Sequence, residues 1–390
     1  MVQPIFPTYS IPYIVFYLLI FFFFFIESKN YSICKSNKLV YFFTFLLFLL
    51  FIGLRGHIYT DWFSYVDIFE ETPQFWNWRT LNYIGDGKME FGFLLFTVFI
   101  KTLFSNYFFW VFIIVLINLL VLNKLFKKYT KYYTLAFLTF FIMNGLGIVF
   151  NLYRNSIALS LFLLSLFFLK ERKFTKYLIL NLLGACFHYS ALLFIPLYFL
   201  LNKDIPRKII WLLFIIANLV FLLKIKWLSY ILGDIVSIIN ISQISDKINA
   251  YSTGDSATFT IGYFERVFTF VFFTLFYKDL VLKDHFNKIF YNIFILFFLC
   301  VFMLSEVRVF SDRFSYLFIF SYWFLYPNIY ALFSNKSKKY LFISLFFCYS
   351  IFRLYTANTN LMAKYDNLLW GIENYQDRSK RFYENSKYFE

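Results

Sequence analysis

The stretch LVYFFTFLLFLLFIGL, from Leu39 to Leu54, contains no charged side chain and no alternation of apolar and polar residues. Inside a lipid bilayer, backbone N–H and C=O groups must pair within helices or closed barrels. A barrel strand alternates between lipid-facing and lumen-facing residues, so an unbroken apolar run favours a helix. A second unbroken run, 11–26, precedes it. These runs predict α-helices that cross a membrane.

The rest of the chain repeats this pattern. Hydrophobic residues make up 61% of the 390 residues, charged residues make up 15%, and the mean hydropathy is +0.65. Soluble domains are about half apolar, so this chain has more apolar surface than such a domain buries. We therefore predict an all-α fold, with residues 1–390 forming one polytopic membrane domain of about 10–12 transmembrane helices. The predicted spans are 11–26, 39–54, 91–105, 107–123, 132–150, 155–169, 177–201, 208–224, 263–282, 288–305, 314–334 and 339–356.

The net charge of +15 is distributed unevenly. A basic, aromatic-rich chain can bind nucleic acid, but in a membrane protein the simpler cause is the excess of Lys and Arg in cytoplasmic loops. Part of the excess also suits anionic lipid or a phosphorylated substrate. We expect no nucleic-acid partner. The basic connections 29–38, 170–176 and 336–339 are predicted to be cytoplasmic, and the acidic segment 55–90 is predicted to be an outer, periplasmic loop.

Two basic stretches conflict with a simple alternation of crossings. Lysines in 124–131 reach the cytoplasm only if the short run 91–105 does not cross fully. The basic stretch 203–208 falls on the outer side, against the usual rule. The segment 225–262 is predicted to be an amphipathic surface segment or a loop. The path of the chain through these stretches stays open.

Four arginines fall at span ends on the predicted outer side, where few are expected. A guanidinium matches two phosphate oxygens at once, so the set favours a diphosphate site. The alternatives are ion pairs with Asp61, Glu306 or Asp312, or contacts with lipid headgroups. The four are Arg55, Arg154, Arg308 and Arg313.

Three residues are candidates for a catalytic role. His188 lies in the predicted span 177–201, where it acts as a base or orients a substrate if the span is broken near it; otherwise a neighbouring carbonyl satisfies it. Asp61 and Glu90 bracket the outer loop and are candidate carboxylate bases, although most loop carboxylates are only solvated. The chain has no nucleotide-binding loop, no HExxH and no Cys–His metal spacing. We therefore predict no cofactor and no metal ion.

An ordered series of short motifs resembles the EpsG-like, Wzy-type polysaccharide polymerase family. In that family an Arg at a span end is followed by a Thr-Asp pair and a Tyr, and further motifs come later in a fixed order. The sequence departs from the pattern at Tyr59, where the family usually has Gly, and at Asn155, where it usually has Gln. The matching stretches are Arg55-Gly56-His57-Ile58-Tyr59-Thr60-Asp61-Trp62-Phe63-Ser64-Tyr65, Glu90-Phe91-Gly92-Phe93, Arg154-Asn155-Ser156-Ile157-Ala158, Phe187-His188-Tyr189-Ser190-Ala191 and Arg313-Phe314-Ser315-Tyr316.

The resemblance implies a glycosyltransferase of the bacterial inner membrane, an O-antigen polymerase or a related polysaccharide polymerase. Such an enzyme joins lipid-linked repeat units on the periplasmic side. The implied partners are undecaprenyl-diphosphate-linked glycan as donor and acceptor, membrane lipid, and a chain-length regulator protein. The arginines then hold the diphosphate, Tyr65 belongs to the substrate-binding set, and Trp62, Trp76 and Trp78 stack on sugars.

Two alternatives to a polymerase remain open. An O-antigen ligase-type transferase shares the diphosphate donor and the arginines. A flippase or transporter for lipid-linked oligosaccharides typically has internal repeats, and the sequence has no convincing repeat.

Overall fold

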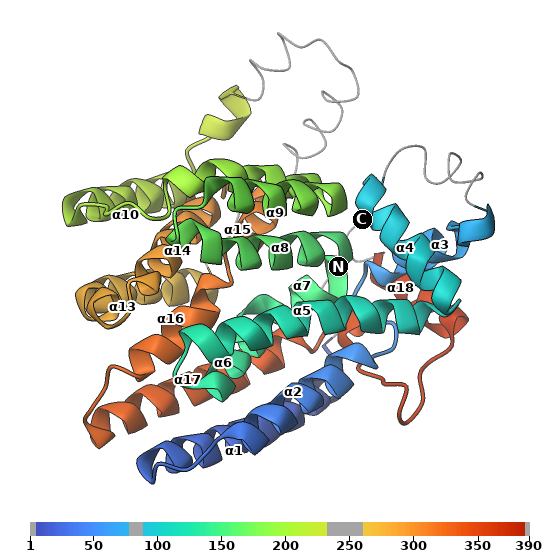
Figure 1. Ribbon diagram of the computed structural model, residues 1–390, viewed down its shortest axis with the longest axis horizontal. Coiled ribbons are helices and arrows are strands. Elements are labelled where there is room, and N and C mark those ends of the chain that lie inside the picture. The colour runs from blue at the N-terminus through green and yellow to red at the C-terminus, as the bar shows by residue number, and fades with distance from the viewer. Residues whose placement is uncertain (1–4, 78–88, 232–259, 387–390) are drawn as a thin grey trace. The chain divides into compact units, whose positions relative to one another are not determined.

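The computed structural model describes residues 5–77, 89–231 and 260–386, and these residues form α-helices joined by short connections (Figure 1). The described residues contain no β-strand, only isolated bridges at Arg55, Asn367 and Gly371. The chain divides into two compact units, one of Met1–Tyr198 with Tyr326–Glu390 and one of Phe199–Leu325. The all-α prediction is confirmed, and the single membrane domain stays a prediction.

Several helices have the length and composition of membrane spans. The described residues contain six such stretches: Pro7–Ser32, Tyr107–Tyr129, Tyr133–Asn151, Tyr153–Lys170, Phe286–Met303 and Lys336–Ala357. Shorter apolar helices cover Lys38–Gly53, Phe91–Leu103, Phe174–Phe187 and Tyr189–Phe199. At 1.5 Å per residue, a helix of about 20 residues matches the hydrocarbon core of a bilayer. The chain is therefore a polytopic helical membrane protein.

The first unit is a bundle of long helices (Figure 1). Helix α1 (Ile11–Ser32) packs against α2 (Lys38–Gly53), α6 (Tyr133–Phe140) and α17 (Lys336–Ala357). Helix α2 also packs against α5 (Tyr107–Tyr129), and α5 packs against α8 (Tyr153–Lys170), which in turn packs against α9 (Phe174–Phe187). Aromatic rings fill the bundle; those of Phe16 and Phe51, for example, stack with their centroids 4.0 Å apart.

This bundle has two chemically distinct ends. At the lysine end, Lys29, Lys131, Lys336 and Lys339 line one cavity. At the arginine end, α2 finishes and α8 begins, which places Arg55 and Arg154 there. The lysines thus mark the predicted cytoplasmic side, and Arg55 and Arg154 lie at the opposite end of the bundle.

Helix α4 (Phe91–Leu103) stays at the arginine end. Its Lys101 ammonium donates to the carbonyls of Phe69 and Glu70 in α3 (Trp62–Glu71), each at 2.7 Å. Helix α5 then starts at Tyr107, whose hydroxyl is 3.1 Å from that of Tyr153, and runs to the lysine end. The run 91–105 therefore does not cross fully.

This path resolves the conflict over the lysines in 124–131. The Tyr31 hydroxyl, at the end of α1, donates to the carbonyl of Lys131 at 2.7 Å. The Lys128 ammonium lies 4.2 Å from the ring centroid of Phe167, near the end of α8. The lysines that follow α5 thus share one end of the bundle with those that follow α1.

The predicted single span 177–201 is wrong. Helix α9 ends at Phe187, His188 is extended at φ −158° and ψ 126°, and a 3₁₀ helix, η5 (Tyr189–Phe199), follows. The chain turns back at His188, because the Tyr177 hydroxyl donates to the Phe194 carbonyl and the rings of Phe174 and Tyr198 are 4.9 Å apart. The conflict over 203–208 came from counting this antiparallel pair as one crossing.

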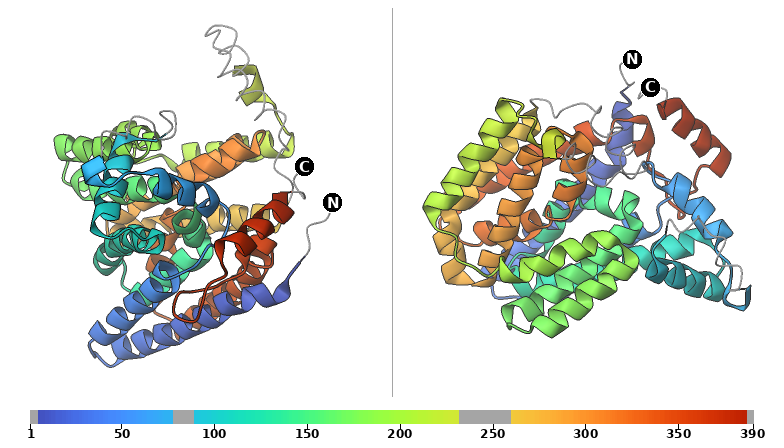
Figure 2. Two further views of the ribbon diagram at one scale, coloured as in Figure 1. Left: turned by 90° about the vertical axis from the view of Figure 1, so that its right-hand side faces the viewer. Right: turned by 90° about the horizontal axis from the view of Figure 1, so that it is seen from above.

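The chain's C-terminal segment covers the arginine end of the bundle, a feature for which the sequence analysis made no prediction. The amide of Leu368 donates to the Leu54 carbonyl at 2.8 Å. In α18 (Tyr375–Ser386), the ring of Phe382 stacks on that of Phe63, with centroids 4.5 Å apart. Helix α18 also lies beside the start of α1 (Figure 2), where Arg381 donates to the Tyr9 hydroxyl.

The second unit contains α10 (Arg207–Leu222), α13 (Ile261–Lys283), α14 (Phe286–Met303), α15 (Arg308–Tyr316) and the start of α16 (Ser321–Tyr330). Helices α13 and α14 pair through the hydroxyls of Thr274 and Tyr291, 2.7 Å apart. Most of the predicted segment 225–262 lies outside the described residues. Its described beginning is anchored by Glu306, which accepts hydrogen bonds from the amides of Leu228 and Ser229.

Candidate active site

Three of the candidate residues meet at the arginine end of the first unit, although they come from distant parts of the sequence. Glu90 precedes α4, Arg154 lies in the first turn of α8, and His188 follows α9. Glu90 Oε2 accepts from Arg154 Nη1 at 2.5 Å, and Glu90 Oε1 is 2.7 Å from His188 Nδ1. Glu90 is only 3% exposed, whereas Arg154 and His188 are 23% and 31% exposed. The carboxylate is thus buried behind a cation and an imidazole that both remain accessible.

The Glu90 carboxylate is ionised in this setting. Burial alone would raise its pKa, but the hydrogen bond with His188 and the charge of Arg154 together lower the pKa of Glu90 to about 2. An ionised carboxylate only accepts hydrogen bonds, so His188 Nδ1 must be the donor. In a neutral imidazole with a proton on Nδ1, the other nitrogen, Nε2, carries the lone pair. Glu90 therefore fixes the orientation of the His188 ring and directs Nε2 away from the carboxylate.

The break at His188 allows this contact. The His188 amide still donates to the Gly184 carbonyl at 2.9 Å, but α9 ends there and the backbone at His188 is extended. The amide of the next residue, Tyr189, also points at Glu90 Oε1, at 3.3 Å. A broken span at His188 is the condition under which this residue is predicted to act on a substrate, and the helix does end there.

Gly92 brings the two backbones together. A Cβ atom at this position would lie 2.8 Å from both Cβ and the carbonyl oxygen of Cys186. Because Cys186 sits in the last turn of α9, two residues before His188, only a residue without a side chain permits this approach. Gly92 therefore sets the distance between Glu90 and His188.

We expect Gly92→Ala to destabilise the protein, because the added methyl group pushes α4 away from α9 and lengthens the Glu90–His188 hydrogen bond. Overpacking of this kind typically costs about 1–3 kcal/mol of stability. The matched control is Gly262→Ala, where the nearest atom is the flexible end of Arg266. Thermal unfolding of the detergent-solubilised variants measures the effect. Equal stability of the two variants would contradict the assigned role of Gly92.

Tyr65 supports Arg154. Its hydroxyl accepts from Arg154 Nε at 3.3 Å, and its ring stacks on that of Tyr153 with centroids 4.3 Å apart. Burial raises the pKa of Tyr65 to about 12, with Arg154 opposing the rise and the Asp61 carboxylate adding to it. Tyr65 is buried in the protein, so its substrate-binding role stays a prediction.

Arg55 is buried, and its guanidinium is bonded to other groups of the protein. It is 1% exposed, and its guanidinium donates to the carbonyls of Ile52 and Val149 and to the Tyr153 hydroxyl. Its carbon Cζ also lies 4.4 Å from the ring centroid of Phe150. These contacts join the end of α2 to the break between α7 (Leu146–Asn151) and α8. Diphosphate binding by Arg55 stays a prediction. The contacts of Arg55 are those of a residue that positions neighbouring helices.

Arg308 and Arg313 lie in the second unit. Arg308 is 69% exposed and is 3.8 Å from Asp312, one turn further along α15. Burial raises the pKa of Asp312, against the charges of Arg308 and Arg266. Arg313 is exposed on the same short helix. Anion binding by Arg308 and Arg313 stays a prediction.

Asp61 and Trp62 lie at the start of α3. Asp61 is half-buried, and its amide approaches Asn151 Oδ1 at 3.5 Å. Trp62 is buried, and its indole donates to the Tyr59 carbonyl at 2.9 Å. Trp76 is exposed, as stacking on a sugar would require, and Trp78 lies outside the described residues. The catalytic role of Asp61 and the sugar contacts stay predictions.

No role was predicted for His57, which is packed among aromatic rings at the arginine end of the bundle. The centroids of Trp62 and Phe108 lie 4.6 and 5.1 Å from that of His57. His57 Nδ1 is buried without a hydrogen-bond partner among the described residues. Burial, and then the charges of Arg378 and Arg55, lower the pKa of His57 to about 4. His57 is therefore neutral at physiological pH.

This burial predicts a loss of stability in acid. An exposed histidine in the unfolded chain titrates near pH 6.5, so below that pH the unfolded state binds a proton that the folded state excludes. The His57 contribution is complete above about pH 6.5 and falls as the pH drops towards 4, by at most about 3 kcal/mol. Thermal unfolding of the detergent-solubilised protein between pH 7.5 and 5 measures this. His57→Phe should flatten the pH dependence, and an unchanged slope in that variant would rule out this source.

Among residues 5–77, 89–231 and 260–386, no three His, Cys, Asp or Glu side chains are grouped closely enough to hold a metal ion. The polar centre described above consists instead of a buried carboxylate, an imidazole, a guanidinium and a phenol. The chain is thus a multi-pass helical membrane protein with a carboxylate–histidine–arginine centre at one end of its bundle.

Comparison with known proteins places this chain in a family. The model of the EpsG family matches residues 38–367, which is most of the chain and includes Glu90, Arg154 and His188. The chain belongs to the EpsG family. No curated protein matches it, and no solved structure does either. Membership of this family suggests a polysaccharide polymerase.

Proposed function

We propose that the chain is a membrane glycosyltransferase that polymerises oligosaccharide repeat units carried on a lipid diphosphate. The observation that carries the proposal is the position of Glu90 between His188 and Arg154. One carboxylate thereby orients a base and pairs with a cation at the same point. Glycosyl transfer from a diphosphate needs both functions, one at the incoming hydroxyl and one at the leaving group.

His188 would act on the acceptor. Its Nε2 accepts the proton of the acceptor sugar hydroxyl as that oxygen bonds to the anomeric carbon of the donor sugar. The bond between the anomeric carbon and the diphosphate oxygen breaks, and the electron pair leaves with the diphosphate. Glu90 holds the ring in the tautomer with a free Nε2 and stabilises the imidazolium that forms, the part a carboxylate plays beside a catalytic histidine.

Arg154 would act on the leaving group. A guanidinium placed where negative charge develops stabilises the departing diphosphate. Its partial exposure keeps the group accessible, and Tyr65 and Glu90 fix its plane. Arg154 is also the one predicted anion-binding arginine of the first unit that is both accessible and adjacent to the base.

The location of the site supports an outer-face reaction. The lysine end of the bundle fits the cytoplasmic side by the positive-inside rule, and this supports a periplasmic position for Glu90, Arg154 and His188 in the proposed enzyme. Lipid carriers need apolar surface next to the site, and exposed side chains such as Phe91, Leu95 and Phe99 of α4 provide it. From the family resemblance, the proposed donor and acceptor are undecaprenyl-diphosphate-linked glycans.

Deletion of the gene tests the proposal. Cells that lack the chain should carry surface glycan of a single repeat unit, and a plasmid copy should restore long chains. Long chains that accumulate on the carrier lipid would instead indicate a ligase, and repeat units trapped on the cytoplasmic side would indicate a flippase. An unchanged glycan ladder in the deletion strain would overturn the proposal.

A further inference from the structure

The lysine end of the first unit contains a cavity of about 430 Å³ at the other end of the bundle from the proposed active site. Its walls come from α1, the α5–α6 connection, α16 and α17. Four lysines line it, and none of the lining residues is an aspartate or a glutamate. The lining consists of Phe24, Phe25, Ser28, Lys29, Tyr31, Ser32, Lys131, Tyr132, Tyr330, Lys336, Lys339, Tyr340 and Ile343.

Rings and hydroxyls, not carboxylates, hold the ammonium groups. Lys339 Nζ is 3.5 Å from the Tyr132 hydroxyl and 5.6 Å from the ring centroid of Tyr330. Lys131 Nζ lies 5.3 Å from the ring centroid of Tyr31. Within the described part of the chain, no carboxylate forms an ion pair with these lysines. The lining therefore carries ammonium groups and no carboxylate, while the nearby Glu27 carboxylate is buried and bonds the amides at the start of α6.

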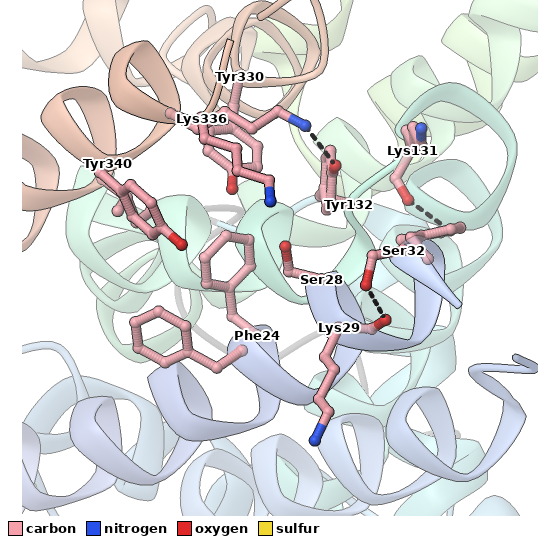
Figure 3. Close-up of a pocket in the computed structure, with 13 residues that line it drawn as sticks. Phe24, Ser28, Lys29, Ser32, Lys131, Tyr132, Tyr330, Lys336 and Tyr340 are labelled. Carbon is pink, nitrogen blue, oxygen red and sulfur yellow. Dashed lines mark hydrogen bonds between the residues drawn. The ribbon is translucent and has the colours of Figure 1, made fainter. Parts of the chain in front are cut away.

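Figure 3 shows how the side chains are arranged. Phe24, Ser28, Tyr330 and Tyr340 are grouped around a common space, and the Lys29 side chain points away from it. Hydroxyl donors and an apolar ring thus share the cavity. Lysines at the start of α17 border the same space.

Two neighbouring helix starts differ in how their amide groups are satisfied. At the start of α6, the buried Glu27 carboxylate accepts from the amides of Tyr133 and Thr134 at 2.8 and 2.9 Å. At the start of α17, the Asn335 side chain accepts from the Ser337 amide at 2.7 Å, and the first turn has Lys336 and no acidic residue. Cations at a helix N-terminus oppose the helix dipole, whereas an anion is favoured there. An anion in the cavity would offset both the dipole and the lysines.

We propose that this cavity binds the phosphate group of an anionic ligand. Ammonium groups of Lys336 and Lys339 and hydroxyls of serine and tyrosine are donors that suit phosphate oxygens. The apolar lining formed by Phe24, Phe25 and Ile343 suits hydrocarbon attached to that phosphate. An anionic phospholipid headgroup and a small soluble phosphate share this chemistry, and basic pockets between transmembrane helices on the cytoplasmic side bind such headgroups.

Binding to the purified full-length protein tests the proposal. The protein in a neutral detergent is titrated with dioleoyl phosphatidylglycerol, with dioleoyl phosphatidylcholine, and separately with inorganic phosphate, while the shift in thermal unfolding temperature is followed. We expect saturable binding of an anionic probe. Lys336→Gln/Lys339→Gln should weaken it about tenfold to thirtyfold, since each surface lysine contributes about one order of magnitude or less.

Lys124→Gln/Lys128→Gln is the matched control, because these lysines lie at the same end but outside the cavity lining. It should bind like the wild type, and Lys339→Arg, which keeps the charge, should too. Saturation by phosphatidylglycerol alone would identify a lipid headgroup, and saturation by phosphate would identify a soluble ligand. Equal binding of phosphatidylcholine, no saturation by any probe, or equal weakening in the control would overturn the proposal.

Should the double variant unfold, the single variant Lys336→Gln decides the question. This residue is exposed and forms no hydrogen bond through its side chain among the described residues, so its loss leaves the fold intact. Its affinity for the anionic probe should fall by a smaller factor, and the remaining affinity should drop as salt rises. Wild-type affinity in that variant would count against the site.

Discussion

Replacement of His188 with glutamine should lower the rate of glycan extension by about 10²- to 10⁴-fold, the usual contribution of a positioned general base. Glutamine retains a polar group near Glu90 but has no nitrogen lone pair to take the acceptor proton. The loss should appear in kcat, with the KM for the lipid-linked acceptor little changed, because the base acts in the transition state. Extension of a synthetic polyprenyl-diphosphate oligosaccharide by the purified protein measures both constants.

A second variant, Glu90→Gln, tests whether the carboxylate sets the tautomer of His188. The amide can donate to His188 Nδ1 and so favours the tautomer with the proton on Nε2, where the base is needed. We therefore expect a large fall in kcat from a residue that is almost completely buried. His285→Gln, a histidine at the start of α14 in the second unit, is the matched control. If His188→Gln and His285→Gln extend glycan at similar rates, His188 is not the base.

Replacement of Arg154 with alanine is expected to reduce kcat by about 10²- to 10³-fold, the effect typical of one group that stabilises developing negative charge. Lysine should not restore the rate. Arg154 donates through Nη1 to Glu90 and through Nε to the Tyr65 hydroxyl, and a single ammonium cannot reproduce that planar pair of contacts. Single-turnover extension rates, at saturating donor, separate this effect from weaker donor binding.

Two comparisons keep the Arg154 result interpretable. Arg172→Ala changes an exposed arginine in the turn between α8 and α9 and should extend glycan like the wild type. Loss of Arg154 also leaves the Glu90 carboxylate buried without its cation, which is destabilising. The folded fraction of each variant is therefore measured by gel filtration in detergent. A well-folded Arg154→Ala protein that makes normal long chains would remove Arg154 from the proposed site.

Some of the site was visible in the sequence. Arg154 is predicted from its place at a span end on the outer side, His188 from its place in an apolar span, and Glu90 from its place at the edge of the outer loop. The motifs that resemble the EpsG-like family contain all three residues. Their direct contact was not predictable, since Glu90 and His188 are 98 residues apart and no local pattern pairs them. The sequence also did not distinguish the role of Arg55 from that of Arg154. Both are arginines at span ends, and only packing buries one among carbonyls and leaves the other accessible.

By itself, the sequence determined that the chain crosses a membrane as helices, and it predicted that lysines gather on the cytoplasmic side. Both follow from composition along the chain, because transfer into lipid depends on how apolar a segment is and insertion depends on the charges that flank it. Tertiary structure alone decided that α4 stays at one end and that the chain reverses at His188. The segments before and after such a turn are equally apolar, so hydropathy does not show that the chain reverses between them. The reversal depends instead on distant partners, Glu90 for His188 and Tyr177 for the returning η5, which fix where the helix stops.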